Sequence, residues 1–392
     1  MAPKRPFISI ARWEARWMKK GNLKLTAASA VVPVVIVSFP KGLGGPQKWL
    51  EEILPELMRR PGLSVETWYP RGPFTGLSGK VRLYRLVKRR LEGQAQKVVY
   101  LSLDLDFAAQ LLFCLRLIGF KRIIIHAHAG RFTARYRFLL CLYRFLARRA
   151  AAWIAVSEQA GEAMFGRSFR SRGKIIPASI DFVRLLGCSN TADSEERVVM
   201  PRPEHGRLFA FIGRLSLEKC AHTAIERFAR HCDDFSDDRL IIVGDGPERA
   251  RLEQLATCLL PAGAFRFTGA IENIGWLMRN EVDCVLVPSL FEGQCRVVAE
   301  AQFFGATVIA SDSVPDIAFL DPTTAIRIPV SEPERWRQAM AGVQVNSFNA
   351  DMSRARQMEN NAPIGMSRVI ERFECVVRRV GGPAVAQTSA RH

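Results

Sequence analysis

VPSLFEGQCRVVAEAQFFG, residues 287–305, is the stretch that most constrains the fold and function of this chain. Its pattern predicts a buried strand ending at Pro288, then a short loop and a helix. Glu292 lies in the loop and Glu300 about two turns inside the helix, so loop and helix N-terminus would present backbone N–H groups to one anion. Acidic residues near a helix N-terminus also stabilise the helix dipole. The two glutamates alone therefore fit a binding role and a structural role equally well.

Charge is divided unevenly between the two halves of this 392-residue chain. Residues 1–185 contain 33 Lys and Arg against 11 Asp and Glu, a net +22, whereas residues 186–392 contain 23 against 27, a net −4. The length and the 48% hydrophobic content predict two globular domains and exclude a disordered or fibrous chain. A strongly basic half is suited to nucleic acid, an anionic membrane or a phosphorylated substrate.

Cysteine usage and apolar runs bear on the cellular location. The nine cysteines form no CxxC pair and no metal-like cluster, which favours a reducing cytoplasm. The longest uncharged run near the N-terminus, between Lys24 and Lys41, is too short to span a membrane and contains Pro33. No small-residue cleavage site follows it, which argues against a signal peptide. We expect a chain that is soluble or bound at a membrane surface.

Apolar segments of strand length alternate with helical patterns along both halves. This alternation predicts an α/β fold with doubly wound parallel sheets. In the first half, strands are expected at 31–40, 63–69, 97–104 and 122–132. The expected organisation is a first domain at 1–186, a linker at 187–206, a second domain at 207–366, and a C-terminal helix and flexible tail at 367–392.

Two features of the first half lie where strands are expected to end. Gly44 and Gly45 belong to a tight loop after the first strand, where phosphate could approach the backbone. His126 and His128 lie at the end of segment 122–132, and alternation places both imidazoles on one side of a regular strand. A metal site is disfavoured there, because such sites normally need three or four ligands and no third ligand is evident nearby.

In the second half, glycines and polar residues collect at expected strand ends: Gly213-Arg214, Gly244 to Pro247, Gly269, and Pro288 to Gly293. Ligands of open parallel sheets bind beyond the carboxyl ends of the strands, so these segments should converge. Arg214 and Lys219 are five residues apart across one loop and can reach the same anion. A fixed cation and a mobile cation together suit a diphosphate.

With these pieces in place, the sequence resembles the family-4 glycosyltransferases, retaining nucleotide-sugar enzymes of the GT-B fold. The matching segments, in the order and approximate spacing of the family, are GRLSLEK (213–219), VGDGPER (243–249), FTGAIEN (267–273) and the opening stretch. The resemblance is strong over about 207–320. In the first half it rests on SFPKGLGG (38–45), the two histidines and KIIPASID (174–181). It implies two Rossmann-like domains facing across a cleft.

The resemblance also implies roles for individual residues. Arg214 and Lys219 would hold the donor diphosphate, Glu300 the ribose hydroxyls and Glu292 the donor sugar. His128 would lie near the donor sugar, with His126 as second choice, and the expected catalytic group is His128, Glu292, Arg214 and Lys219. The other expected donor-site residues are Gly44, Gly45, Gly213, Gly244, Gly269, Ile271, Gly293, Gln294, Cys295, Arg296 and Val297.

The chemistry that the resemblance implies is retaining and independent of metal or cofactor. Arg214, Lys219 and helix N-termini would stabilise the diphosphate leaving group, and a donor phosphate oxygen would take the acceptor proton. No side-chain nucleophile is assigned, and Glu292 in that role ranks low. The chain departs from the family at three places: Gln294-Cys295 replaces Phe-Gly, Cys220 replaces Gly, and Ala178-Ser179 replaces Asn-Gly. The first change makes the donor sugar hard to predict.

The expected partners are a nucleotide-sugar donor, UDP- or GDP-linked, and a saccharide or lipid-linked acceptor bound by the basic half. We hypothesise that segments 80–90 and 135–149, and residues 7–20, dock on an anionic membrane. A merely solvated basic surface is the alternative. Two other functions stay open: a catalytically inactive GT-B scaffold, and a nucleic-acid-binding protein. The second lacks any recognisable nucleic-acid-binding motif, so nucleic acid is not an expected partner.

Overall fold

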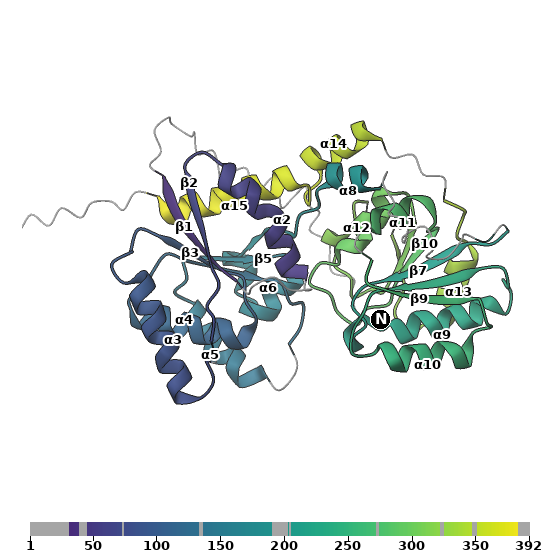
Figure 1. Ribbon diagram of the computed structural model, residues 1–392, viewed down its shortest axis with the longest axis horizontal. Helices are drawn as coiled ribbons and strands as arrows, with labels where there is room; N and C mark the ends of the chain where they lie inside the picture. The colour runs from purple at the N-terminus through teal and green to yellow at the C-terminus, as the bar shows by residue number, and fades with distance from the viewer. Residues whose placement is uncertain are drawn as a thin grey trace, which may run out of the picture.

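The chain folds into two α/β domains, each built on a six-stranded parallel sheet (Figure 1). The computed structural model describes residues 31–38, 45–72, 74–132, 136–189, 203, 205–271, 274–321, 325–346 and 351–382, with residues 45–48 described by their backbone alone. The predicted fold class is therefore confirmed. Residues 1–24 and the loop containing Gly44, on which two predictions rest, lie outside the described residues.

The first sheet has the strand order β2-β1-β3-β4-β5-β6. Its strands are β1 (Val32–Val37), β2 (Leu63–Trp68), β3 (Val98–Leu101), β4 (Ile123–Ala127), β5 (Ala152–Ala155) and β6 (Lys174–Ile175). The helices between them are α2 (Gly45–Arg59), α3 (Gly76–Leu91), α4 (Leu105–Leu117), α5 (Arg137–Ala147), α6 (Glu158–Phe165) and α7 (Phe169–Arg172). Figure 1 shows α3, α4 and α5 together on one side of this sheet and α2 on the other.

The second sheet has the order β12-β11-β10-β7-β8-β9. Its strands are β7 (Leu208–Ile212), β8 (Arg239–Val243), β9 (Phe265–Gly269), β10 (Cys284–Val287), β11 (Thr307–Ala310) and β12 (Ile326–Arg327). Its helices are α8 (Phe182–Cys188), α9 (Ala221–Cys232), α10 (Arg249–Leu259), α11 (Ile274–Asn280), α12 (Arg296–Phe303), α13 (Pro333–Ala341) and α14 (Met352–Asn361).

Burial on both faces explains why the strands read as continuous apolar runs. In β7, Leu208 and Ala210 pack into one core of the second domain, whereas Phe209 and Phe211 pack into the core on the opposite face of the sheet. Successive side chains of a strand point to opposite faces, so helices on both faces require an apolar residue at every position.

Each sheet has a point where the strand order reverses direction. In the first sheet this point lies between β1 and β3, and in the second it lies between β7 and β10. Loops leaving the carboxyl ends of strands diverge at such a point, which creates the ligand site of doubly wound folds. In the second sheet the two diverging loops are those that contain Lys219 and Glu292.

The chain passes between the domains at a point earlier than we predicted. Ala178 belongs to the core of the first domain, whereas Ile180, Phe182 and Leu186 belong to the core of the second. The predicted boundary at residue 186 is therefore wrong by several residues, because the apolar side of α8 is buried in the second domain. Most of the predicted linker 187–206 lies outside the described part of the chain.

The C-terminal helix returns to the first domain. α15 (Met366–Gly381) buries Val369, Phe373 and Val377 in the first core, and Phe373 lies edge-on to Tyr100 of β3. We predicted a C-terminal helix within 367–392 but assigned it to a separate C-terminal segment. It is instead part of the first domain, as Figure 1 shows for the yellow helix above the first sheet. Beyond Gly382 the predicted flexible tail lies outside the described residues.

A helix and a strand follow each other closely in the apolar and basic stretch that precedes α6. The apolar and basic stretch at 135–153 contains α5, which ends at Ala147, and β5, which begins at Ala152. The indole of Trp153 donates to Ala147 O at 2.9 Å and stacks on Phe165 at 4.9 Å, so Trp153 belongs to the sheet and its core. Among the described residues, no helix is long and apolar enough to cross a membrane.

Candidate functional site

A lysine and a glutamate meet at the carboxyl ends of the central strands of the second sheet. Lys219 closes the 3₁₀ turn after β7, and Glu292 lies in the loop after β10. Lys219 Nζ lies 2.6 Å from Glu292 Oε1, which also accepts a hydrogen bond of 2.7 Å from Ser289 Oγ. Glu292 is only 7% exposed. The ion pair occupies the strand-reversal point, where doubly wound folds bind ligands.

The surroundings keep the lysine charged. Burial lowers the pKa of Lys219, but the carboxylates of Glu292 and Glu218 outweigh burial, so the pKa is raised overall. Burial also raises the pKa of the Cys295 thiol, and Glu292 raises it further. The thiol is therefore neutral at neutral pH. A charged lysine in a partly dry site is well placed to stabilise negative charge that develops on a ligand.

Close backbone packing joins the loops that follow β7, β8 and β9. A Cβ added to Gly244 would lie 1.9 Å from Gly213 O, and a Cβ added to Gly246 would lie 2.3 Å from Leu215 O. The Gly244 N–H donates to Gly269 O at 2.7 Å. The predicted convergence of Gly213, Gly244 and Gly269 is thus what the structure has, and any side chain at 244 or 246 would force these loops apart.

In the sequence, Arg214 precedes Lys219 and Glu300 follows Glu292. Arg214 directly follows Gly213 and is exposed, whereas Glu300 is buried in α12. Arg296, in the first turn of α12, lies 3.7 Å from Glu300 and forms a 2.9 Å ion pair with Glu52 of α2 in the first domain. Glu52 was not predicted, since nothing in an isolated amphipathic helix signals a partner on the other domain.

The remaining donor-site predictions concern backbone and packing positions. Gly269 ends β9 with a φ of +76°, a conformation that favours glycine. Ile271 and Val297 are partly buried and pack against the second core. Gly45 is the first residue of α2. The roles predicted for these four residues toward a nucleotide remain predictions.

The first domain directly touches loop 289–295, which we call the donor loop after its predicted role. A Cβ added to Gly293 would lie 1.9 Å from His128 O, and a Cβ added to Gly130 would lie 2.1 Å from Glu292 O. The segment after β4 and the loop after β10 are therefore in backbone contact across the domain boundary. The carboxyl ends of the two sheets face each other at this point, as predicted for the two domains.

His126 lies in β4 and His128 directly after it, and the two histidines have different surroundings. His126 accepts a hydrogen bond from the Tyr100 hydroxyl at Nδ1 and donates from Nε2 to Ile176 O at 3.1 Å. It is 2% exposed and belongs to the core. His128 lies beyond the strand end, with Nε2 3.1 Å from Ser102 Oγ. His128 was the better match to the family, and it is the one of the two that lies beside the donor loop. Ser102 follows β3 and was not predicted.

Both imidazoles are neutral at neutral pH. Burial and the neighbouring His128 lower the pKa of His126 well below its usual range, and burial lowers the pKa of His128 to about 3. His128 thus offers a hydrogen bond and no positive charge at this site. The described residues contain no group of three or more His, Cys, Asp or Glu side chains that could hold a metal ion.

The lowered pKa predicts a pH-dependent stability. The unfolded chain binds a proton at the ordinary histidine pKa of about 6.5, whereas folded His128 binds one only near pH 3. The unfolded state therefore holds more protons between these values, and the free energy of unfolding falls as pH drops. From pH 8 to pH 5 His128 alone should remove about 2 kcal/mol. Urea titrations of wild type and His128→Gln check this: equal pH dependence in both would contradict it.

The departures from the family pattern fall into two structural kinds. Cys220 and Cys295 have φ of +52° and +71°, and they are the only residues other than glycine with positive φ in the described part of the chain. The backbone thus keeps a conformation that favours glycine where the family has glycine. Gln294 and Ala178, from two separate departures, contact each other: the Gln294 amide donates to Ala178 O at 2.9 Å and accepts from Ala178 N–H at 2.6 Å.

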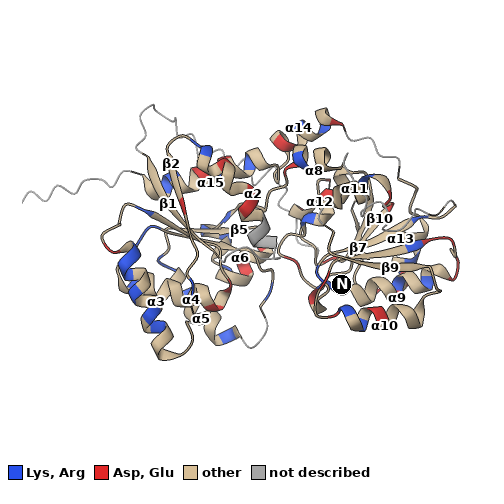
Figure 2. Cartoon of the chain, in the orientation of Figure 1, with Lys and Arg blue, Asp and Glu red and all other residues tan. Residues whose placement is uncertain are grey.

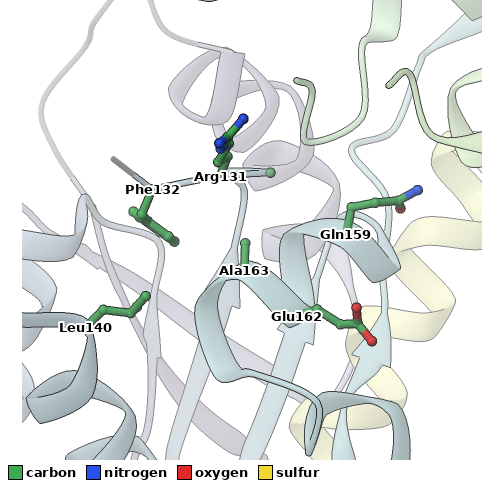
Figure 3. Close-up of a pocket in the computed structure, with 7 residues that line it drawn as sticks. Arg131, Phe132, Leu140, Gln159, Glu162 and Ala163 are labelled. Carbon is green, nitrogen blue, oxygen red and sulfur yellow. The ribbon is translucent and has the colours of Figure 1, made fainter. Parts of the chain in front are cut away.

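An open pocket of about 450 Å³ lies in the first domain, next to the contact between Gly130 and Glu292. It begins at Gly130, which touches the donor loop, and extends between the segment after β4, α5 and α6 (Figure 3). Its lining residues are Gly130, Arg131, Phe132, Leu140, Gln159, Glu162 and Ala163. The lining combines cationic, anionic, amide, aromatic and aliphatic groups, and Glu162 forms an ion pair with Arg170.

Residues 193–319 match the family model described as glycosyl transferases group 1. The matched segment covers about a third of the chain, most of it in the second domain, and is similar to the group 1 glycosyltransferases. It contains Lys219, Glu292 and Glu300, so the ion pair and the buried helix glutamate belong to the matched region.

Two curated proteins are similar to parts of the chain. The putative glycosyltransferase EpsF of Bacillus subtilis (strain 168) is 29% identical over 241 residues, 58% of this chain and 60% of EpsF. A GDP-mannose-dependent alpha-(1-6)-phosphatidylinositol dimannoside mannosyltransferase of Mycobacterium tuberculosis is 30% identical over 176 residues, 41% of this chain and 45% of that protein. The chain therefore matches about half of the length of these relatives.

Solved structures share the fold of both domains. Anabaena Alr3699/HepE in complex with UDP superposes with a TM-score of 0.60 at 17% identity, covering 89% of this chain and 97% of that one. An alpha,alpha-trehalose-phosphate synthase (UDP-forming) from Burkholderia vietnamiensis gives a TM-score of 0.66 at 12% identity, with 89% and 99% coverage. The two doubly wound domains form a GT-B fold, as predicted.

Proposed function

We propose that this chain is a retaining, metal-independent family-4 glycosyltransferase that transfers a sugar from a UDP- or GDP-sugar to a saccharide or lipid-linked acceptor. The observation that carries the proposal is the Lys219–Glu292 ion pair at the strand-reversal point of the second domain, within the segment similar to the group 1 glycosyltransferases. A UDP complex among the structural neighbours and a GDP-mannose-dependent relative support a nucleotide-sugar donor.

In the proposed mechanism, two cationic side chains stabilise the negative charge of the leaving group. Lys219 and Arg214 bind the donor diphosphate and stabilise the charge that forms as the anomeric bond breaks. Glu292 accepts hydrogen bonds from hydroxyls of the donor sugar, and Glu300 does so from the ribose. Neutral His128, held by Ser102, contributes a hydrogen bond near the sugar. The acceptor oxygen attacks the anomeric carbon directly as the bond to the diphosphate breaks, and its proton passes to a donor phosphate oxygen. No side-chain nucleophile therefore takes part.

The pocket beside Gly130 is the proposed acceptor site. It lies in the first domain and starts at the backbone contact with Glu292, next to the proposed position of the donor sugar. Arg131, Gln159 and Glu162 offer polar contacts for hydroxyl groups, while Phe132 and Leu140 offer an apolar wall (Figure 3). Mixed polar and apolar lining of this kind is typical of sites that orient a small ligand.

An exposed surface that is both basic and apolar supports a lipid-linked acceptor. Helices α3, α4 and α5 carry seven large apolar side chains that are more than two-fifths exposed: Leu77, Val81, Phe113, Leu117, Phe138, Leu142 and Phe145. Figure 2 shows Lys and Arg along α3 and on α5. Leu140 of α5 also lines the pocket. We propose that this surface, the α3–α5 face, rests on an anionic membrane on its cytoplasmic side; nine free cysteines support a reducing compartment.

Membrane binding through this face is testable by vesicle flotation. Phe138 and Phe145 are 84% and 69% exposed. Replacing both by serine should weaken binding to vesicles that contain anionic lipid by about tenfold, because two aromatic side chains that would insert into the membrane are lost. Leu259→Ser, at a 45% exposed position on α10 of the second domain, is the matched control and should bind like wild type. Equal flotation with anionic and neutral vesicles would reject the proposed surface.

Enzymatic activity is testable with a panel of UDP- and GDP-sugars and mass detection of the products. The proposal expects release of UDP or GDP and transfer of the sugar to an acceptor or to water. Binding of a nucleotide without any turnover would instead support the inactive GT-B scaffold. The same panel identifies the donor, which the changed residues Gln294 and Cys295 leave open.

A further inference from the structure

The side chain of Gln294 joins the donor loop to the point where the chain crosses between the domains. Its carboxamide makes two hydrogen bonds with the backbone of Ala178, and Gln294 is 5% exposed. We propose that Gln294 is a positioning residue for glycosyl transfer: it holds the loop 289–295, and with it Glu292, in the geometry that transfer needs. This inference rests on the proposed function of the same site.

Within its own domain, the donor loop is fastened through its backbone at its start and through the Glu292 side chain, which is held by Lys219 and Ser289. Ser311 and Ser313 donate to Ser289 O at 2.5 and 2.6 Å, and Leu290 N–H donates to Glu218 O at 2.9 Å. These bonds fix the start of the loop against β11 and the loop after β7. Glu292 follows two residues later, so its position also depends on what holds the far end of the loop.

Near its far end, just before α12 begins, the loop is also tied to the first domain through Gln294. Ala178 belongs to the first core, and the next residue, Ser179, accepts from the Trp49 indole at 3.1 Å and donates to Met366 Sδ at 3.2 Å. Both passages of the chain between the domains therefore meet beside Ala178, with Ile180 N–H donating to Ile364 O at 2.8 Å. Residues at such a crossing point are displaced least when two domains rotate relative to each other. A hydrogen bond to Ala178 is therefore kept through such a rotation.

The same cluster reaches the residue that faces the donor loop from the first domain. The Trp49 ring lies 5.5 Å from the ring of His128, whose carbonyl oxygen meets Gly293. Ala178 and His128 thus contact adjacent residues of the donor loop, Gln294 and Gly293. Trp49 packs against His128 and donates a hydrogen bond to Ser179, the neighbour of Ala178. Because the Gln294 carboxamide pairs at both its oxygen and its nitrogen with Ala178, its contribution to transfer is through the loop and not through contact with the sugar.

Two substitutions at one position test this inference. Gln294→Met keeps the length of the side chain and removes both hydrogen bonds, so nucleotide release from the UDP- or GDP-sugar that wild type consumes should fall about tenfold at every pH. Gln294→Glu keeps the shape, but its carboxylate cannot donate to Ala178 O at pH 8. Burial and the facing Ala178 carbonyl oxygen should raise the pKa of this carboxyl group above its usual range, because both disfavour the carboxylate. Protonation then restores the missing donor, so the rate of Gln294→Glu relative to wild type should rise about tenfold between pH 8 and pH 5.5.

Separate readouts distinguish positioning from general damage. Affinity for UDP or GDP should stay within about twofold of wild type in both variants, because Lys219, Arg214 and Glu300 are unchanged. Gln338→Glu, on the exposed side of α13, controls for an added carboxylate and should follow the pH profile of wild type.

Three outcomes would overturn the inference. Wild-type rates in Gln294→Met, a rate ratio for Gln294→Glu that does not change with pH, or nucleotide affinity that falls as far as the rate would each contradict it. If wild type itself binds no nucleotide and consumes no sugar nucleotide of the panel, the proposed function fails and the inference fails with it. If wild type is active and Gln294→Met is equally active, the inference is wrong while the proposed function stands.

Discussion

Lys219→Ala should lower the rate of transfer from the nucleotide sugar about 1000-fold. The substitution removes the cation that we place on the donor diphosphate, and loss of one such group in a preorganised site typically costs two to three orders of magnitude. It also leaves the buried carboxylate of Glu292 without its 2.6 Å partner. We expect the free energy of unfolding to fall by about 3 kcal/mol for that reason.

A double variant separates the two consequences of this change. Lys219→Ala with Glu292→Gln removes the unpaired buried charge, so most of the stability should return while transfer stays at the level of Lys219→Ala. Arg251→Ala, at an exposed position on α10, is the control for loss of a surface cation and should leave transfer unchanged. Recovery of transfer in the double variant would show that Lys219 acts on stability alone.

Gly293→Ala should lower transfer about 100-fold with a smaller change in nucleotide affinity. The φ of Gly293 lies outside the positive region, so strain is not the cause. The added Cβ would lie 1.9 Å from His128 O, and the donor loop or the segment after β4 must move by about 1 Å or more to make room. A displacement of that size at reacting groups costs about two orders of magnitude in rate.

The structure offers a reciprocal variant and a neutral one. Gly130→Ala places its Cβ 2.1 Å from Glu292 O and should produce a similar loss from the opposite side of the contact. Gly187→Ala, in α8, meets nothing within 4 Å and should retain wild-type rates. Rates within twofold of wild type for both Gly293→Ala and Gly130→Ala would mean that the two loops are not in contact during turnover.

Much of the second domain could be predicted because its signals are local. Strand, glycine loop and helix follow one another along the sequence, and the carboxyl ends of parallel strands must lie on one edge of the sheet. The pairing of Lys219 with the loop of Glu292, and the close approach of Gly213 and Gly244, follow from that rule. Alternation likewise placed His126 and His128 together, with ring centroids 4.2 Å apart.

Contacts between distant segments could not be predicted from these local signals. The side chain of Gln294 bonds to Ala178, 116 residues away, and α15 returns to a core built from the first half of the chain. An amphipathic pattern shows that α15 buries one face but does not indicate against which domain. The position of the crossing at 178–180 was missed for the same reason, since α8 reads as an ordinary apolar segment after a strand.

Titration calorimetry of UDP and GDP with wild type and Lys219→Ala tests the central claim most directly. The account predicts that one nucleotide binds per chain in wild type, and that Lys219→Ala binds it at least tenfold more weakly, because the ammonium group of Lys219 contacts the diphosphate. Absence of binding by both nucleotides to wild type, or equal affinity of wild type and Lys219→Ala, would contradict a donor site built around Lys219 and Glu292.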